Sequence, residues 1–209
     1  MDGSVDAPID KRDALSDKRD WRRRIRTARR SRTGEPGFAT RRVATARRLA
    51  DHVLAAPVGR APFVAAYRSL PTEPPTTVLL HELLRRRRTV LVPDVLPDRA
   101  LDWRLLGADA RPGARAGIDA IGRAGLVLVP ALAVDRFGTR LGQGGGSFDR
   151  ALTWITPGTP IVALLYDDEA LLAPDDPALP REPHDAPVTC VVTPRRGWIP
   201  LDGVGVGHP

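Results

Sequence analysis

The chain of 209 residues has a single cysteine, Cys190, which excludes an internal disulfide and a metal site built from several cysteines. Its longest apolar stretch, residues 126–134, contains Pro130 and falls short of the roughly 20 residues that a membrane-spanning helix needs. Residues 1–6 are acidic and lack the apolar segment of a secretory signal. We therefore expect a cytoplasmic protein of one ordinary-sized domain, with no membrane partner.

Lysine is almost missing as well. Lys11 and Lys18 are the only two among 32 basic residues, so arginine supplies the remaining 30 of the chain, whose net charge is +7. Codon bias in a GC-rich genome, combined with solvated helix faces, explains this pattern most simply. Attraction of an acidic small substrate, or binding of nucleic acid, are the alternatives. Nucleic acid is the less favoured partner, because the first basic helix offers only Trp21 for base stacking and its apolar face should bury that ring.

Apolar runs alternate with helical patterns along the chain, which predicts an α/β fold. After a disordered tail (1–15), Ser16 would cap a helix over Asp17–Ser31, with Trp21, Ile25 and Ala28 on its apolar face and arginines elsewhere. A second helix carries Val43 and the apolar residues that follow it at helical spacing. Further helices are predicted after Pro75 and over 148–156, and strands over 63–67, 89–93, 101–106, 125–130, 160–166 and 188–192. We predict a single domain over 16–200 with a mostly parallel central sheet flanked by helices, in a Rossmann-like three-layer arrangement, followed by a tail at 201–209.

Polar residues follow several of the predicted strands. Because the carboxyl ends of parallel strands meet at one edge of a sheet, these segments should gather along one rim and bind a ligand there. They are residues 68–73, Asp94, residues 135–149 and residues 167–168.

The most informative of these segments is Arg140-Leu-Gly-Gln-Gly-Gly-Gly-Ser-Phe-Asp-Arg150. Such a bare loop lets backbone N–H groups approach a ligand, so it is either an anion site or a flexible surface turn. It is neither a Walker loop nor the dinucleotide-binding Gly-x-Gly-x-x-Gly motif, because no Gly-Lys-Ser/Thr follows and Ser147 stands at the third glycine. Arg140 can bind phosphate with two donors, and Asp149 can bind Mg²⁺.

Two other motifs have two interpretations each, and a third is a pair of basic residues. His184-Asp185, in a proline-rich loop, could present a carboxylate to a metal or form an ordinary turn. Glu73 could favour the positive end of the following helix or accept hydrogen bonds from an amino-heterocycle. Lys18 and Arg22, four residues apart, share one helix face that could simply meet solvent.

Taken together, these motifs resemble the 5-formyltetrahydrofolate cyclo-ligase family over about residues 18–194. The pattern Leu-Gly-x-Gly-x-Gly, preceded by Arg140 and followed by aromatics and Asp149, is the most specific match. The Lys-x-x-apolar-Arg start matches residues 18–22, the acid after the first strand matches Glu73, and Pro-x-x-x-His-Asp matches residues 180–185.

The resemblance implies ATP- and Mg²⁺-dependent cyclisation of 5-formyltetrahydrofolate to 5,10-methenyltetrahydrofolate, with ADP and phosphate released through a phosphorylated formyl group. ATP is then a co-substrate, Mg²⁺ the cofactor, and the folate, which can carry a polyglutamate tail, the second substrate. Arg140 and Asp149 would be catalytic, and Asp149 and Asp185 would hold the metal. Arg68, Glu73, Gln143 and Ser147 would bind the folate. The residues that would bind ATP are Lys18, Arg22, Arg140, Gly142, Gln143, Gly144, Gly145, Gly146, Ser147 and Phe148.

Two positions depart from the family pattern. Ser147 replaces the first of two aromatics before Asp149, and Thr189 stands where relatives often carry Asp. The Ser147 difference leaves open a second reading, a catalytically impaired relative that binds folate or nucleotide. An arginine-rich nucleic-acid-binding protein is the third. We expect a monomer.

Overall fold

The computed structural model of the protein describes residues 11–183 and 185–201. Its helices are α1 (Lys11–Thr33), α2 (Phe38–Ala55), α3 (Thr77–Arg85) and α4 (Ser147–Leu152), with short 3-10 helices η1 (Pro57–Arg60), η2 (Ala120–Arg123) and η3 (Asp167–Glu169). Its strands are β1 (Phe63–Ala65), β2 (Thr89–Val95), β3 (Leu101–Leu106), β4 (Pro112–Gly117), β5 (Leu126–Pro130), β6 (Ala133–Asp135), β7 (Arg140–Leu141), β8 (Ile161–Leu164), β9 (Ala170–Leu171), β10 (Cys190–Thr193) and β11 (Gly197–Pro200).

The main sheet has eight strands in the order β11-β10-β8-β5-β1-β2-β3-β4. Strands β10, β8, β5, β1 and β2 pair in parallel, whereas β11 at one edge and β3 and β4 at the other pair antiparallel. This arrangement confirms the predicted α/β fold with a mostly parallel sheet. From β1 the chain adds β2 on one side, then returns to place β5 on the other, so the doubly wound sheet has its switch point between β1 and β5.

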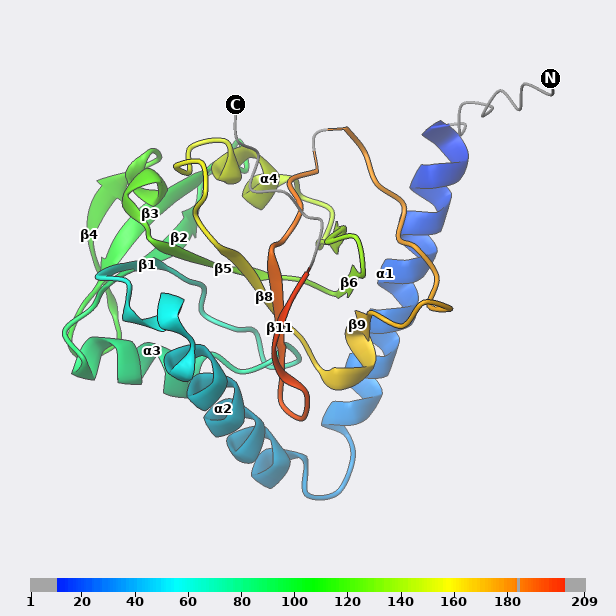
Figure 1. The fold of residues 1–209 in the computed structure, drawn as a ribbon, viewed down its shortest axis with the longest axis horizontal. Coiled ribbons are helices and arrows are strands. Elements are labelled where there is room, and N and C mark those ends of the chain that lie inside the picture. The colour runs from blue at the N-terminus through cyan, green and yellow to red at the C-terminus, as the bar shows by residue number, and fades with distance from the viewer. Residues whose placement is uncertain (1–10, 184, 202–209) are drawn as a thin grey trace.

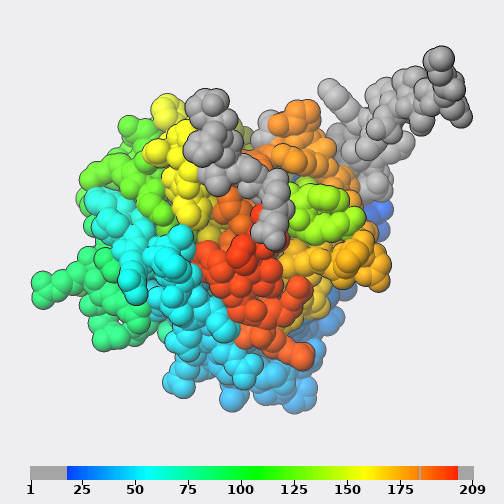
Figure 2. All heavy atoms as spheres, viewed as in Figure 1, coloured from blue at the N-terminus to red at the C-terminus, as the bar shows by residue number. Residues whose placement is uncertain are grey.

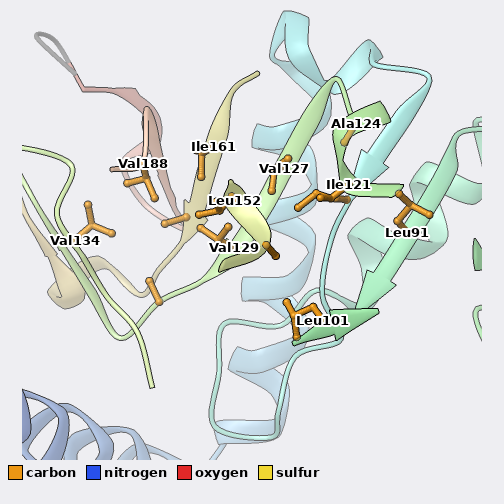
Figure 3. Close-up of a cluster of buried hydrophobic side chains, with 14 of the residues drawn as sticks. Leu91, Leu101, Ile121, Ala124, Val127, Val129, Val134, Leu152, Ile161 and Val188 are labelled. Carbon is orange, nitrogen blue, oxygen red and sulfur yellow. The ribbon is translucent and has the colours of Figure 1, made fainter. Parts of the chain in front are cut away.

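Apolar side chains cover both faces of this sheet. Helices α2 and α3 pack on one face, where Leu49 and Leu83 are fully buried together with Val64 of β1. The opposite face packs against η2 and α4: in Figure 3, Ile121 and Leu152 lie beside Val127 of β5. The first four residues of β5 are all buried, because its side chains point alternately to the two faces and each face meets a separate helical layer.

A second, small sheet (β7-β6-β9) stands next to the main one. Helix α1 lies along it, apart from α2 and α3 (Figure 1), and its Trp21 and Ile25 pack against Leu132 and Leu141. The turn after β10, red in Figure 2, lies beside α2 on the face shown there. Because α1 packs on Leu141 of β7, it lies on the side of the molecule where the glycine-rich segment at 142–146 leaves that strand.

Several sequence-based expectations were wrong in detail. Helix α1 begins at Lys11, so Ser16 does not cap it, while residues 1–10 of the predicted tail lie outside the described residues. On α1, Ala28 is exposed and Arg29 is buried, the reverse of the predicted apolar face. On α2, Val43 is exposed. No helix in the described ranges is both long and apolar enough to cross a membrane.

Candidate active site

A cavity of about 770 Å³ lies at the carboxyl ends of β1, β2 and β5, at the switch point of the sheet. Residues 142–146 and residues at the ends of these strands line the cavity. Segments that the sequence placed on one rim meet here, which confirms that prediction for residues 68–73, Asp94 and residues 140–149. Asp167 and Asp168 lie elsewhere, in a separate hollow lined by α1 and α2. The charged residues that line the main cavity are Lys18, Arg22, Arg68, Glu73, Asp94, Arg104, Arg140, Asp149, Glu182 and Asp185.

The glycine loop, residues 142–146, runs from β7 into α4. Gly144 and Gly146 have φ angles of +97° and +65°, which residues other than glycine rarely adopt. A Cβ atom on Gly144 would also lie 3.3 Å from Cζ of Arg22, so the loop needs glycine there for space as well as conformation. The loop is thus a shaped segment of the cavity wall, packed closely on α1.

The polar groups of this loop are arranged asymmetrically. The carbonyl oxygen of Gly142 accepts a 3.0 Å hydrogen bond from Nε of Arg22. Within the described part of the chain, the N–H groups of residues 143–146 donate no hydrogen bond. Consecutive free N–H groups that line a cavity form a site suited to an anion. Residues 142–146 line the cavity, while Gln143 and Gly144 remain exposed, so the anion site stays a prediction.

Arg140 and Asp149 are ion-paired through Nη2 and Oδ1. The Arg140 side chain is only 4% exposed, and its Nε is buried without a hydrogen-bond partner among the described residues. Its Nη1 makes a long contact of 3.4 Å to the carbonyl of Pro130, at the end of β5. Asp149 is 23% exposed and faces the cavity, so this pair combines a held cation with a reachable carboxylate.

Lys18 and Arg22 both line the cavity, so their shared face does not meet open solvent. Nζ of Lys18 lies 2.7 Å from Oε1 of Glu182 and 2.9 Å from Oδ2 of Asp185. The side chain of Lys18 is 8% exposed. Lys18, which was predicted to bind phosphate, is thus paired with two carboxylates of the proline-rich loop. Sequence reasoning missed Glu182, which sits three residues before Asp185 and was read only as part of the motif.

The predicted metal ligands, Asp149 and Asp185, line the same cavity, each paired with a basic side chain. Among the described residues, no group of three or more metal-ligating side chains occurs. Mg²⁺ commonly binds one or two carboxylates and completes its coordination with substrate phosphates and water. Asp149 and Asp185 thus match the number of carboxylates that Mg²⁺ commonly takes from a protein. His184, the neighbour of Asp185, lies outside the described residues.

Glu73 is 5% exposed and lies in the loop between β1 and α3. It precedes the first turn of α3, which contains no acidic residue, so the helix-end interpretation is wrong. Its Oε2 accepts a 2.9 Å bond from the N–H of Leu70, and its carbonyl accepts bonds from Nη1 of Arg42 (2.6 Å) and the Tyr166 hydroxyl (3.2 Å). Held by these bonds, Glu73 lines the same cavity as the glycine loop.

Tyr67, just after β1, lines the cavity but was not singled out from the sequence. Its hydroxyl is buried and has no partner among the described residues. Burial, reinforced by the negative charge of Glu73, raises the pKa of Tyr67 far above its ordinary value, so the phenol stays neutral. The sequence signal was its position: it directly follows a buried strand whose carboxyl end faces the switch point.

The remaining predicted residues differ in their placement. Arg68, Gln143 and Ser147 line the cavity, as does Phe148, whose ring meets that of Trp103 edge to face with centroids 6.4 Å apart. Thr189, the second departure from the family pattern, is absent from this lining and its hydroxyl bonds the carbonyl of Ile161. Only Ser147 therefore changes the chemistry of the cavity wall.

The sheet order and the cavity at its switch point define a doubly wound α/β protein with a ligand site at the strand ends. The sequence model of the 5-formyltetrahydrofolate cyclo-ligase family matches residues 14–194. The chain therefore belongs to the 5-formyltetrahydrofolate cyclo-ligase family.

Individual relatives agree with this assignment. A 5-formyltetrahydrofolate cyclo-ligase of Mycolicibacterium smegmatis is 37% identical over 153 residues, 66% of this chain and 76% of that protein. One from Escherichia coli K12 is 29% identical over 158 residues, 68% of this chain and 83% of that protein.

Two solved structures share the fold. The 5,10-methenyltetrahydrofolate synthetase of Aquifex aeolicus superposes with a TM-score of 0.67 at 23% identity, covering 91% of this chain and 96% of that one. The corresponding values for the synthetase of Mycoplasma pneumoniae are 0.62, 16%, 84% and 97%.

Proposed function

We propose that this chain is a 5-formyltetrahydrofolate cyclo-ligase that uses ATP to close the folate ring, yielding 5,10-methenyltetrahydrofolate, ADP and phosphate. The observation that carries the proposal is that residues 143–146 line a cavity together with basic side chains, while their N–H groups donate no hydrogen bond within the described chain. Family membership supplies the reaction, and this geometry supports where it takes place.

The nucleotide would bind on the glycine-loop side. Phosphate oxygens are strong acceptors. The backbone N–H groups of the loop and the charged guanidinium groups of Arg22 and Arg140 supply hydrogen-bond donors. Lys18 adds positive charge at the same wall, although Glu182 and Asp185 share it. A triphosphate would therefore bind in the cavity against the N–H groups of the loop, near the Arg22, Arg140 and Lys18 side chains that line it.

The folate would bind on the opposite side, near Glu73. The Glu73 carboxylate, which already accepts a bond from the N–H of Leu70, can accept two more from the amino group and ring N–H of a pterin. Arg68 lies on the same rim and is exposed, so it is available to the acidic tail of the folate, with or without additional glutamates. The formyl group would then lie between Glu73 and the glycine loop.

Asp149 and Asp185 would hold Mg²⁺, which on binding neutralises phosphate charge and favours transfer of the terminal phosphoryl group. Asp149 is the more reachable of the two residues of its ion pair. Arg140, released from or shared with that carboxylate, would donate to the same phosphoryl oxygens.

The reaction would take place in two steps. The formyl oxygen forms a bond to the γ-phosphorus as the bond between that phosphorus and the β-bridging oxygen breaks, releasing ADP. The N10 nitrogen then bonds to the formyl carbon, the carbon–oxygen bond breaks, phosphate leaves, and N10 loses its proton. An amide oxygen is a poor leaving group until it is phosphorylated, so the protein's contribution is positioning and charge neutralisation.

The test is to mix the purified chain with Mg-ATP and 5-formyltetrahydrofolate and follow methenyl-folate by its near-ultraviolet absorbance, with ADP and phosphate measured in parallel. We expect equal amounts of the three products, and none without ATP. Binding of both substrates without any product would refute the proposal and support the impaired relative, for which Ser147 is the specific observation. Salt-sensitive binding of nucleic acid without folate binding would support the third reading.

A further inference from the structure

Arg26 on α1 holds the glycine loop at a residue that lines the cavity. Its Nε donates to the side-chain Oε1 of Gln143 at 2.9 Å, and its Nη2 donates to the carbonyl oxygen of Gln143 at 2.8 Å. One turn earlier on the same helix face, Arg22 binds the carbonyl of Gly142 at 3.0 Å. Arg26 itself is not among the residues that line the cavity, whereas Arg22 and Gln143 are.

These contacts fix the direction of two successive peptide groups. In a trans peptide, the carbonyl of one residue and the N–H of the next point in opposite directions, and the described chain contains no cis peptide. With the carbonyls of Gly142 and Gln143 turned toward α1, the N–H groups of Gln143 and Gly144 point away from the helix. Neither N–H donates a hydrogen bond within the described residues.

Glycine makes this restraint necessary. A segment with glycine at 142, 144, 145 and 146 has many accessible backbone conformations, and ordering them costs conformational entropy. A loop already ordered by the protein binds an anion without that cost at the moment of binding. Contacts from outside the loop are therefore what prepares its N–H groups.

We infer that Arg26 is a positioning residue of the nucleotide site, which acts through Gln143 to keep the N–H groups of the glycine loop turned toward the ligand. The inference rests on the proposed function only in taking the ligand of the loop to be the phosphates of ATP. The planar guanidinium matters because two parallel N–H donors reach two oxygens of one residue, which the single ammonium group of lysine does not reproduce.

The experiment compares three variants on one helix. Arg26→Ala removes the contact, and Arg26→Lys keeps the charge but loses the paired donors. Arg23→Ala removes the same charge from a neighbouring position, where the side chain is 74% exposed and, among the described residues, pairs with Asp20. We expect KM for ATP to rise about fivefold in both Arg26 variants, with KM for 5-formyltetrahydrofolate unchanged and Arg23→Ala equal to the original chain.

A charge effect on ATP would give a different pattern. If Arg26→Lys retained the original KM for ATP, or Arg23→Ala raised it as much as Arg26→Ala, the inference would be overturned. Equal KM values in all four proteins would overturn it as well.

Two readouts without turnover separate this inference from the proposed function. Calorimetric dissociation constants for Mg-ATP should follow the same pattern as KM, and heteronuclear NOE values of Gly144 and Gly145 should fall in both Arg26 variants alone. A chain that binds Mg-ATP but forms no product refutes the proposed function, while these readouts still decide the inference. A chain that does not bind Mg-ATP overturns both.

Discussion

Arg29 and Glu169 form a buried ion pair through both carboxylate oxygens, with Nε 2.8 Å from Oε1 and Nη2 2.7 Å from Oε2. Their side chains are 2% and 3% exposed. The same Nη2 also donates to the carbonyl of Ala131 at 2.7 Å, just beyond β5. One guanidinium thus joins α1, the end of a central strand and η3.

We predict that Arg29→Ala lowers the free energy of unfolding by about 3–5 kcal/mol, because Glu169 is left buried without its counter-ion. Chemical denaturation followed by circular dichroism measures this. Arg85→Ala, which removes an exposed arginine paired with Glu82, is the control and should leave the transition unchanged. Equal transitions for the two variants would contradict the prediction.

Asp149→Asn should abolish Mg²⁺-dependent turnover while the far-ultraviolet spectrum stays native, because the amide keeps the shape but loses the charge that would bind the metal. Stability should fall as well, since the Arg140 guanidinium, 4% exposed, loses its counter-ion. Turnover at a series of Mg²⁺ concentrations and a thermal melt test both effects. Asp98→Asn, on an exposed turn, is the control. Normal turnover by Asp149→Asn would mean that the metal binds elsewhere.

Gly144→Ala should destabilise the chain by about 1–3 kcal/mol, since φ of +97° is unfavourable for alanine and the new Cβ would meet Arg22. Gly145→Ala is the matched comparison: its φ is not positive, and its Cβ would make an ordinary 3.5 Å contact with Oγ of Ser147. Denaturation of both variants measures the difference. If Gly145→Ala proved the more damaging to stability, the described loop conformation would be wrong.

Glu73→Gln should raise KM for 5-formyltetrahydrofolate by about 10- to 100-fold, because hydrogen bonds to a charged group are replaced by one acceptor and one mismatched donor. KM for ATP should stay within twofold, since the nucleotide is assigned to the other wall. Glu82→Gln on α3, outside the cavity lining, controls for the lost charge. A larger effect on ATP than on the folate would reverse the assignment of the two walls.

Cys190 should be unreactive in the folded protein. Burial raises the pKa of its thiol from 9.0 to about 12, so the thiolate that reacts with disulfide reagents is scarce at pH 8. Because the folded pKa is the higher one, this group's contribution to stability is present below pH 9 and declines as pH rises toward 12. Titration with a chromogenic disulfide should detect one thiol per chain only after denaturation. Rapid reaction of the native protein at pH 8 would contradict this.

Sequence patterns predicted what depends on local periodicity. The run Leu126–Pro130 was identified as a strand because an uninterrupted apolar stretch suits a position buried on both faces, and it lies at the centre of the sheet. By contrast, β4 was not predicted, because Pro112–Gly117 is an exposed edge strand without alternating apolar residues. Edge strands are defined by their neighbour, here β3, and not by their own composition.

The sequence also did not predict which charged side chains are buried. Arg29 was placed among solvent-facing arginines, because its partner Glu169 stands 140 positions away. Lys18 likewise meets Glu182 and Asp185 across 164 and 167 positions. Helical spacing identifies which residues share a face but not what covers that face. The glycine loop was found because backbone freedom is a property of glycine itself, whereas the orientation of its N–H groups depends on Arg22 and Arg26.

The antiparallel extension of the sheet has a consequence for evolution. Leu101 and Arg104 of β3, with Pro112 of β4, form part of the cavity wall, yet these strands lie outside the parallel core that creates the switch point. A hairpin at a sheet edge can change in length and side chains while the central strand order stays intact. Selection on ligand shape can therefore act on β3 and β4 while the glycine loop and the central strands stay unchanged.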